Sequence, residues 1–220
     1  MKWRIQLVET VLYISESKSL YFVFDHQNIQ QHNVYRCIVQ APVELKIYCI
    51  ILYASSTHID CIFDVHSSGA HVQLYSLYAL SGNESLHIRT FQNHFVPGAQ
   101  SVVTLHGIVS QKAQCDFYGS IDIAKTAQQT QAHMEHKAII MESTARVSAQ
   151  PTIQVHTNNV SCGHGSASGP FDEEQIYFLM ARGCTKQDAQ KIVLRAFFEE
   201  ILAQHPDKSS ILASIEKKIL

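Results

Sequence analysis

Cys162 and His164 could bind a metal ion together, because they stand two residues apart in a Ser-Cys-Gly-His-Gly run. In an extended backbone, residues at this spacing project to the same side. A thiolate and an imidazole both bind soft or borderline iron, and mixed cysteine and histidine ligation occurs in iron–sulfur centres. Two protein ligands are too few for a permanent four-ligand site. The pair therefore predicts a transient iron or cluster site that another chain completes.

The same run also fits a purely structural role. Its glycines permit backbone angles that other residues resist, so we expect residues 162–165 to form a turn after a strand. In that alternative Cys162 packs inward and His164 hydrogen-bonds to backbone groups. The C-x-H spacing alone favours the structural role, and the residues around it, described below, favour the site.

A second group of possible metal ligands is His133-Met-Glu-His136. On a strand, His133 and Glu135 would share one face while His136 points away, which divides the group. On a helix the two histidines would be neighbours, but nothing around them supports a long helix. We expect a solvated loop here and no metal site.

A cysteine hydrolase is a further possibility, with Cys162 as nucleophile and His156 or His164 as base. Such an enzyme also needs a group that orients the base and donors for the oxyanion. No nucleophile elbow or protease signature surrounds Cys162. No G-x-x-x-x-G-K-[ST] motif occurs, so any dependence on ATP must come from a separate subunit. We therefore expect no enzyme activity from this chain.

Short strands dominate the chain before Asp172, and no convincing helix interrupts them. Alternation or continuous apolar runs, separated by Ser-Gly, Gly-Asn and Pro-Gly turns, mark each one. The candidate strands begin with the alternating Trp3, Ile5 and Leu7 and continue at 21–23, 34–38, 45–53, 59–65, 71–80, 85–91, 101–109, 115–123, 137–141 and 152–156. A sandwich, a barrel or a β-solenoid fits this pattern, and periodicity cannot choose among them.

Three amphipathic helices follow, at 172–182, 186–203 and 209–220. An acidic start at Asp172, a stop at Gly183 and a capping box at Thr185 and Asp188 mark the first two. The expected apolar stripes contain Ile176, Leu179 and Met180, then Ala189, Ile192, Val193, Ala196 and Phe197, then Ile211, Leu212, Ile215 and Ile219. We expect a β domain at 1–170 and a helical subdomain at 171–220.

The composition is that of a folded protein, with 46% hydrophobic and 16% charged residues in 220. A net charge of −2 and no basic stripe argue against nucleic acid as a partner. No apolar run of 18 residues occurs and the first residues are polar in part, so we expect neither a membrane span nor a signal peptide. Six scattered cysteines without a C-x-x-C pair predict buried thiols in a reducing cytoplasm.

Residues 151–184, PTIQVHTNNVSCGHGSASGPFDEEQIYFLMARGC, are similar to the signature at the end of the core domain in SufB/SufD proteins. These are the scaffold subunits of the SUF iron–sulfur cluster assembly machinery. Residues 119–130, GSIDIAKTAQQT, resemble the preceding segment of that family. The resemblance is strong over 117–198 and looser over 72–116. It implies a right-handed parallel β-helix followed by a small helical subdomain.

The resemblance is to SufD-type rather than SufB-type chains. SufB-like chains carry a His-Glu pair at this point and a cysteine upstream in a T-Q-C-D context, whereas here Gly165 follows His164 and residues 131–140 contain no cysteine. In SufD-type chains the histidine of C-x-H-G is implicated in forming the nascent cluster opposite a SufB cysteine. The resemblance thus implies that role for His164, with Cys162 second.

The resemblance also implies two partners, a SufB-like subunit that pairs through the β-helix and a SufC-like ATPase that binds the helical subdomain. Four aromatic residues exceed what one narrow stripe can bury and are the expected docking surface for the ATPase: Tyr177, Phe178, Phe197 and Phe198. The helices also suit a cap over the end of the solenoid, and the two roles are compatible. A homodimer of the isolated chain fits as well.

Full-length family members carry an additional N-terminal helical region and a longer solenoid, whereas this sequence goes directly from Met1 into strands. A shortened homologue, a degenerate gene product and a core whose open end needs a partner all fit. We expect a non-enzymatic SufD-like scaffold with a transient cluster and no permanent cofactor. The alternatives are a metal-binding protein of unrelated role and a degenerate structural SufD paralogue.

Overall fold

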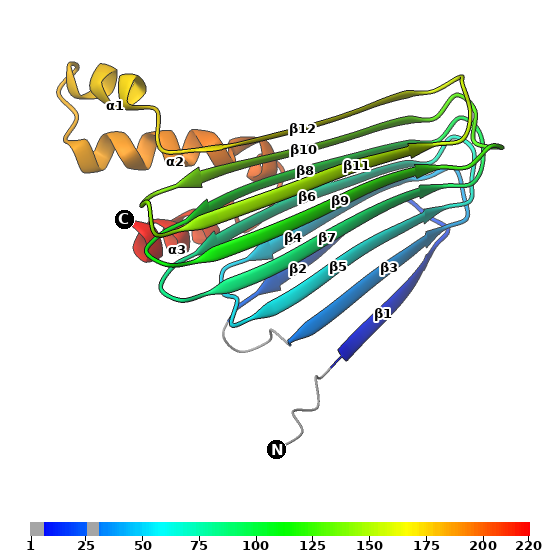
Figure 1. Ribbon diagram of the computed structural model, residues 1–220, viewed down its shortest axis with the longest axis horizontal. Helices are drawn as coiled ribbons and strands as arrows, with labels where there is room; N and C mark the ends of the chain where they lie inside the picture. Colours follow the sequence, from blue (N-terminus) through cyan, green and yellow to red (C-terminus); the bar gives the residue numbers. More distant parts are fainter. Residues whose placement is uncertain (1–6, 26–30) are drawn as a thin grey trace.

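The computed structural model describes residues 7–25 and 31–220, and its core is a parallel β-solenoid (Figure 1). Two six-stranded sheets face each other, with strand orders β1-β3-β5-β7-β9-β11 and β12-β10-β8-β6-β4-β2. The chain alternates between them, so every pairing joins strands two apart in the sequence. This confirms the predicted β-helix and excludes the sandwich and the barrel.

The strands of the odd-numbered sheet are β1 (Leu7–Ile14), β3 (His32–Val39), β5 (Thr57–Val65), β7 (Ser85–His94), β9 (Gln114–Ile123) and β11 (Arg146–Val155). Those of the even-numbered sheet are β2 (Lys18–Phe24), β4 (Glu44–Ile51), β6 (His71–Leu80), β8 (Gln100–Val109), β10 (Gln131–Ile140) and β12 (Ser161–Gly169). Trp3 and Ile5, the start of the first predicted strand, lie outside the described residues.

Apolar side chains fill the space between the two sheets. Ile59, Leu74, Val103 and Phe117 are among the buried residues of this core, which also takes up Cys37, Cys49, Cys61 and Cys115. Four of the six cysteines are thus buried thiols, as predicted, while Cys162 and Cys184 are half-buried. Tight turns connect the sheets, and Gly69, Gly82 and Gly98 have positive φ angles there, which glycine adopts without steric cost.

Three helices follow the last strand: α1 (Glu173–Met180), α2 (Lys186–Leu202) and α3 (Lys208–Ile219). Their predicted ends are confirmed within a few residues. The Asp172 carboxylate accepts hydrogen bonds from the Glu174 and Gln175 amides, and the Thr185 hydroxyl accepts one from the Asp188 amide. Gly183 ends the first helical segment at a φ of 92°. Among the described residues, none of the helices is both long and apolar enough to cross a membrane.

The helices pack against the outer face of the even-numbered sheet, near the carboxyl ends of its strands (Figure 1). Leu77 and Ile108 of the sheet share one apolar cluster with Leu194, Phe198 and Ile215 of the helices. The expectation that the helices cap the end of the solenoid is wrong. α2 and α3 contact β6 and β8, which are central in the strand order of the sheet, rather than its terminal strand. The division into units at residue 170 stays a prediction.

The expected stripe of α2 is wrong in part. Ile192 and Ala196 are exposed, whereas Leu194 and Phe198, four residues apart, form the buried face with Ile201. α2 carries apolar residues on more than one face, and packing against the sheet determines which of them is buried: α2 turns its Leu194 side toward β6 and β8.

Lys218 fixes the end of α3 to the sheet. Its ammonium group donates hydrogen bonds to the carbonyl oxygens of Leu52, at 2.6 Å, and Ala79, at 2.9 Å. It also pairs with the Glu84 carboxylate at 2.6 Å. All three donors of the ammonium group are therefore used, which makes its partial burial tolerable.

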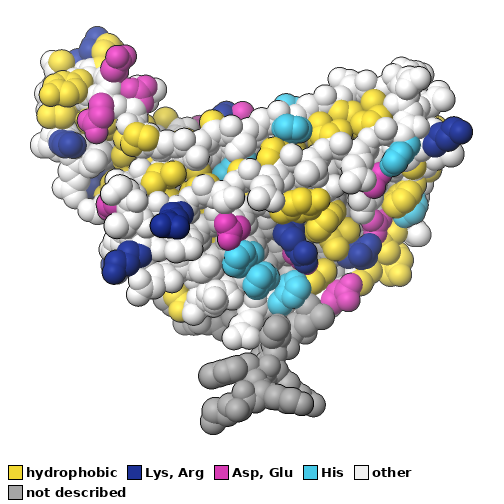
Figure 2. All heavy atoms as spheres, viewed as in Figure 1, with side chains coloured by type: hydrophobic (Ala, Val, Ile, Leu, Met, Phe, Trp, Pro, Cys, Tyr) yellow, Lys and Arg dark blue, Asp and Glu magenta, His cyan; other side chains and the backbone are white. Residues whose placement is uncertain are grey.

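Histidine side chains gather across the outer face of the odd-numbered sheet (Figure 2). His32, His58 and His87 occupy paired positions on β3, β5 and β7, with ring centroids 5.6 and 4.5 Å apart. Asp60 accepts hydrogen bonds from Arg89 and lies 3.1 Å from the His32 ring. Burial raises the pKa of Asp60, but the hydrogen bonds from Arg89 and His32 outweigh it and leave that pKa below its ordinary value. Several of the thirteen histidines thus serve the fold.

Inside the solenoid, Tyr78 lies over Gly107 of the neighbouring strand. A Cβ atom at residue 107 would be 1.8 Å from Cζ of the Tyr78 ring. The Tyr78 hydroxyl lies 3.0 Å from Nε2 of the buried His136. The missing side chain at Gly107 is therefore what allows the ring to reach its hydrogen-bond partner.

We expect Gly107→Ala to lower the free energy of unfolding by about 2–3 kcal/mol, because the added methyl group forces Tyr78 out of its position. Urea unfolding followed by circular dichroism measures the change. Gly169→Ala is the matched control, since no atom lies within 4 Å of its added Cβ. An unchanged urea midpoint for Gly107→Ala would contradict the packing described.

Candidate functional site

Cys162 and His164 lie on β12, the last strand of the even-numbered sheet. The predicted turn at 162–165 is wrong, because residues 161–169 pair in register with residues 131–139 of β10. The neighbouring strand supplies hydrogen-bond partners, and this outweighs the local preference of glycine for turns. The predicted strand before the site is confirmed as the end of β11.

Both side chains point to the interior side of the solenoid. Cys162 pairs with Ala132 and His164 with Met134, and both partners are buried in the core. Paired residues of parallel strands share a face, so the expectation that Cys162 and His164 project together is confirmed. Their Cα atoms are separated by about 6.6 Å, the rise of two strand residues.

The last coil leaves this side of β12 open. Of the described strands, only β10 pairs with β12, so its other edge carries unpaired backbone groups. Cys162 packs partly against the core, while His164 is exposed. A thiol and an imidazole therefore stand together at an open strand edge.

The Cys162 thiol is not an activated nucleophile. Partial burial raises the pKa of Cys162 above its ordinary value. The thiol is therefore protonated at neutral pH and loses its proton readily only when a metal ion or a cation approaches. This argues against the hydrolase alternative. It is compatible with a thiol that is deprotonated only on binding a metal ion.

The group at 133–136 is divided between the two faces of β10, so the predicted loop is wrong and the strand alternative is right. His133 and Glu135 lie on the outer face, and His136 is buried inside. Burial lowers the pKa of His136 to about 4, so this ring is a neutral part of the core. These residues form no common metal site.

The four aromatic residues predicted to dock the ATPase differ in their exposure to solvent. Tyr177 is 71% exposed and Phe178 is 55% exposed. Phe197 is half-buried and stacks on His106, with ring centroids 4.8 Å apart. Phe198 is fully buried in the core between helix and sheet, which corrects its assignment to a surface.

Two further residues belong to the exposed apolar surface of the helices, Met180 and Ile192. A groove between α1 and α2 is lined by five apolar residues and by three polar ones at the start of α1: Phe178, Leu179, Ile192, Val193, Ala196, Asp172, Glu174 and Gln175. Apolar side chains are visible at this end of the molecule in Figure 2. We call these residues, with Tyr177 and Met180, the helical groove. In the sequence, the helical groove is indicated by the apolar residues on the face of α2 that does not contact the sheet.

The protein is therefore a parallel β-solenoid protein with a flanking helical tail and a Cys-x-His pair on its last strand. Residues 14–197 match the family model described as SUF system FeS cluster assembly, SufBD core domain. The chain belongs to the SufBD core family.

The chain is similar to the iron–sulfur cluster assembly protein SufD of Escherichia coli, with 30% identity over 70% of this chain and 37% of that protein. It is 24% identical to SufD of Bacillus subtilis over 71% of this chain and 36% of that protein. The SufBD family protein slr0076 of Synechocystis is 31% identical over 51% of this chain and 24% of its own length. The chain thus spans only a minor part of the curated relatives it matches.

Alkylation of the native protein tests the state of Cys162. Because only thiolate reacts and burial raises the pKa of Cys162, we expect it to react with iodoacetamide at pH 7.5 more slowly than a free cysteine peptide. Its rate should rise with pH to a midpoint above the ordinary value of about 8.5. Timed labelling read by peptide mass spectrometry measures both, with the four buried cysteines as protected controls. A midpoint below that of the free peptide would restore the activated nucleophile.

Proposed function

We propose that this chain is a SufD-like, non-catalytic scaffold for iron–sulfur cluster assembly, and that a nascent cluster forms at His164 and Cys162. The observation that carries the proposal is the thiol and imidazole on the interior side of the last strand, next to an unpaired strand edge. Membership of the SufBD core family supports it.

The ligand count requires a second chain. Iron–sulfur clusters generally take four protein ligands, and this site supplies two. The unpaired edge of β12 offers backbone donors and acceptors to a strand of another subunit. A SufB-like subunit that adds a strand there would bring its own ligands beside Cys162 and His164. Iron and sulfide are then the cargo of the site, and the cluster leaves when the interface is rearranged.

The energy for that rearrangement would come from a SufC-like ATPase on the helical groove. The exposed aromatic side chains of Tyr177 and Phe178 are the residue types that dominate protein interfaces. The Arg182 guanidinium lies 3.4 Å from the centre of the Phe178 ring, a cation–π contact that places a positive charge beside this aromatic side chain. The groove follows the carboxyl end of β12, whereas Cys162 and His164 lie near the amino end of that strand, so an ATPase and a SufB-like subunit would have room to bind together.

Replacing His164 tests the site. We expect His164→Ala, co-expressed with SufB-like and SufC-like proteins of the same host, to lower the cluster yield of the complex at least about tenfold, since a ligand is lost. Its stability should change by less than about 0.5 kcal/mol, because the side chain is exposed. Visible absorption and iron content measure the yield, and thermal unfolding measures stability.

His133→Ala is the matched control, since this exposed histidine lies on the outer face of the adjacent strand. Wild-type yield from the His164→Ala and Cys162→Ala variants would remove the site and leave a degenerate structural paralogue. Stoichiometric iron or zinc bound at this pair in the isolated chain would instead favour a metal-binding protein of unrelated role.

Replacing Phe178 tests the helical groove. We expect Phe178→Ala to weaken binding of the SufC-like ATPase about 10- to 30-fold, because an exposed aromatic anchor is lost. Titration calorimetry with the purified ATPase measures this. Phe95→Ala is the control, since Phe95 is similarly exposed but follows β7, outside the helices. Equal affinities of both variants would place the ATPase elsewhere.

A further inference from the structure

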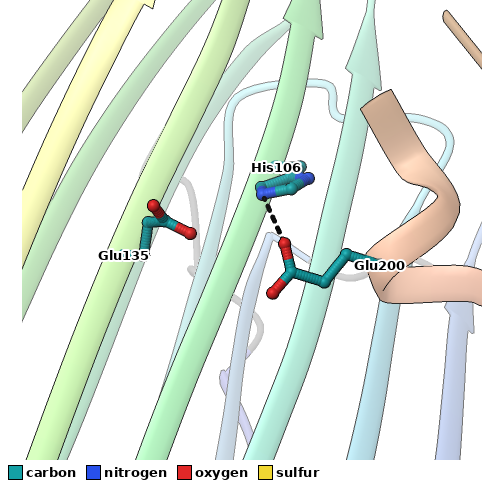
Figure 3. A group of neighbouring side chains, drawn as sticks. All are labelled: His106, Glu135 and Glu200. Atoms are coloured by element: carbon teal, nitrogen blue, oxygen red, sulfur yellow. Dashed lines mark ion pairs between the residues drawn. The ribbon is translucent and has the colours of Figure 1, made fainter. Parts of the chain in front are cut away.

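His106, Glu135 and Glu200 converge where α2 crosses the even-numbered sheet (Figure 3). They come from β8, β10 and α2, and one ligand atom of each lies within 4.8 Å of the others. His106 is only 3% exposed, yet its Nε2 atom has no hydrogen-bond partner among the described residues. The nearest Glu200 oxygen is 3.8 Å away, too far for a hydrogen bond.

The other ring nitrogen shows which way the lone pair points. Nδ1 of His106 lies 2.8 Å from the carbonyl oxygen of Phe197, which only accepts. In the neutral ring Nδ1 therefore carries the proton, and Nε2 presents its lone pair toward Glu200. Burial lowers the pKa of His106, although the Phe197 carbonyl and Glu200 oppose this, so the ring is neutral at pH 7. Metal-binding histidines are usually held in this way, with the second nitrogen on a backbone carbonyl.

We infer that His106, Glu135 and Glu200 bind a divalent first-row transition metal ion that joins α2 to the sheet. One imidazole and two carboxylates are ligands that zinc and similar ions accept. The ligand atoms of a tetrahedral zinc ion lie about 3.4 Å apart, given bond lengths of about 2.1 Å. The present spacing must therefore contract. The side chains of Glu200 and Glu135, 57% and 30% exposed, have the freedom to do so, and water completes the coordination.

Lys137 is the competitor for this site. Its ammonium group lies 2.7 Å from a Glu135 oxygen, and Lys137 is the register partner of His106 on β10. Lys137 neutralises Glu135 when no metal is bound. Metal binding requires the ammonium group to turn outward to solvent, which its 41% exposure permits. Removal of Lys137 should therefore strengthen metal binding, whereas removal of a ligand should weaken it.

A cobalt and zinc titration of the full chain tests the inference. Cys162→Ala/His164→Ala serves as the background, so that the proposed cluster site takes no metal and the two proposals are tested separately. We expect one equivalent of Co²⁺ with visible d–d bands and without the near-ultraviolet charge-transfer band of a thiolate ligand. Zn²⁺ should displace Co²⁺. Zn²⁺ should also raise the temperature of unfolding, because it binds only the folded chain at this site.

Four variants test whether the metal ion binds at these three residues. Glu200→Gln and Glu135→Gln should weaken Zn²⁺ binding about 10- to 100-fold. Lys137→Gln should strengthen it severalfold. Glu199→Gln is the matched control, because Glu199 is exposed on the same helix and pairs with Lys208 instead. Competition against a chelator dye measures each dissociation constant, and circular dichroism verifies that each variant is folded.

Three results would overturn the inference. The first is an absence of binding at millimolar metal. The second is a thiolate charge-transfer band, which would assign the metal to another cysteine. The third is binding that Glu200→Gln and Glu135→Gln leave unchanged, which would identify an adventitious ion only.

Discussion

In-register parallel pairing of every second strand is the constraint on which this structure depends. Each strand lies beside the strand two places earlier, so a side chain that points inward is followed by inward side chains all along the sheet. This one rule builds the apolar core, aligns the histidines of the odd-numbered sheet and places Cys162 and His164 over Ala132 and Met134. A shift of one residue between β10 and β12 would turn both ligands to the other face.

Much of the fold can be read from local signals, because alternation and capping are properties of neighbouring residues. Asp172, Thr185 and Gly183 marked helix ends correctly. The choice among solenoid, sandwich and barrel could not be made from periodicity, since all three use the same alternation, and only the resemblance to SufB/SufD proteins favoured the solenoid. Glycine at 163 and 165 suggested a turn, but pairing with β10 holds this stretch in a strand.

The two proposed metal sites also differ in whether local sequence reveals them. Cys162 and His164 are two residues apart, so a pattern reveals them, whereas His106, Glu135 and Glu200 meet only through the packing of a helix on a sheet. Phe198 was misplaced for a related reason. Its aromatic character indicates an apolar contact, but which helix face the sheet covers is decided by tertiary packing. The helices join the sheet mainly at β6 and β8 and near the carboxyl ends of its strands, whereas Cys162 and His164 lie near the amino end of β12, so the two proposed partner surfaces are at different places.

The ammonium group of Lys218 has a consequence for the order in which this chain folds. Its carbonyl partners Leu52 and Ala79 precede it by 166 and 139 residues, whereas each coil of the solenoid needs only the coil before it. During synthesis the coils can therefore form one after another as the chain leaves the ribosome. The last helix can dock only after Lys218 has been synthesised, long after the coils that contain Leu52 and Ala79. Until then the apolar flank around Leu77 and Ile108 is bare, and that interval is when a newly made molecule is most exposed to aggregation.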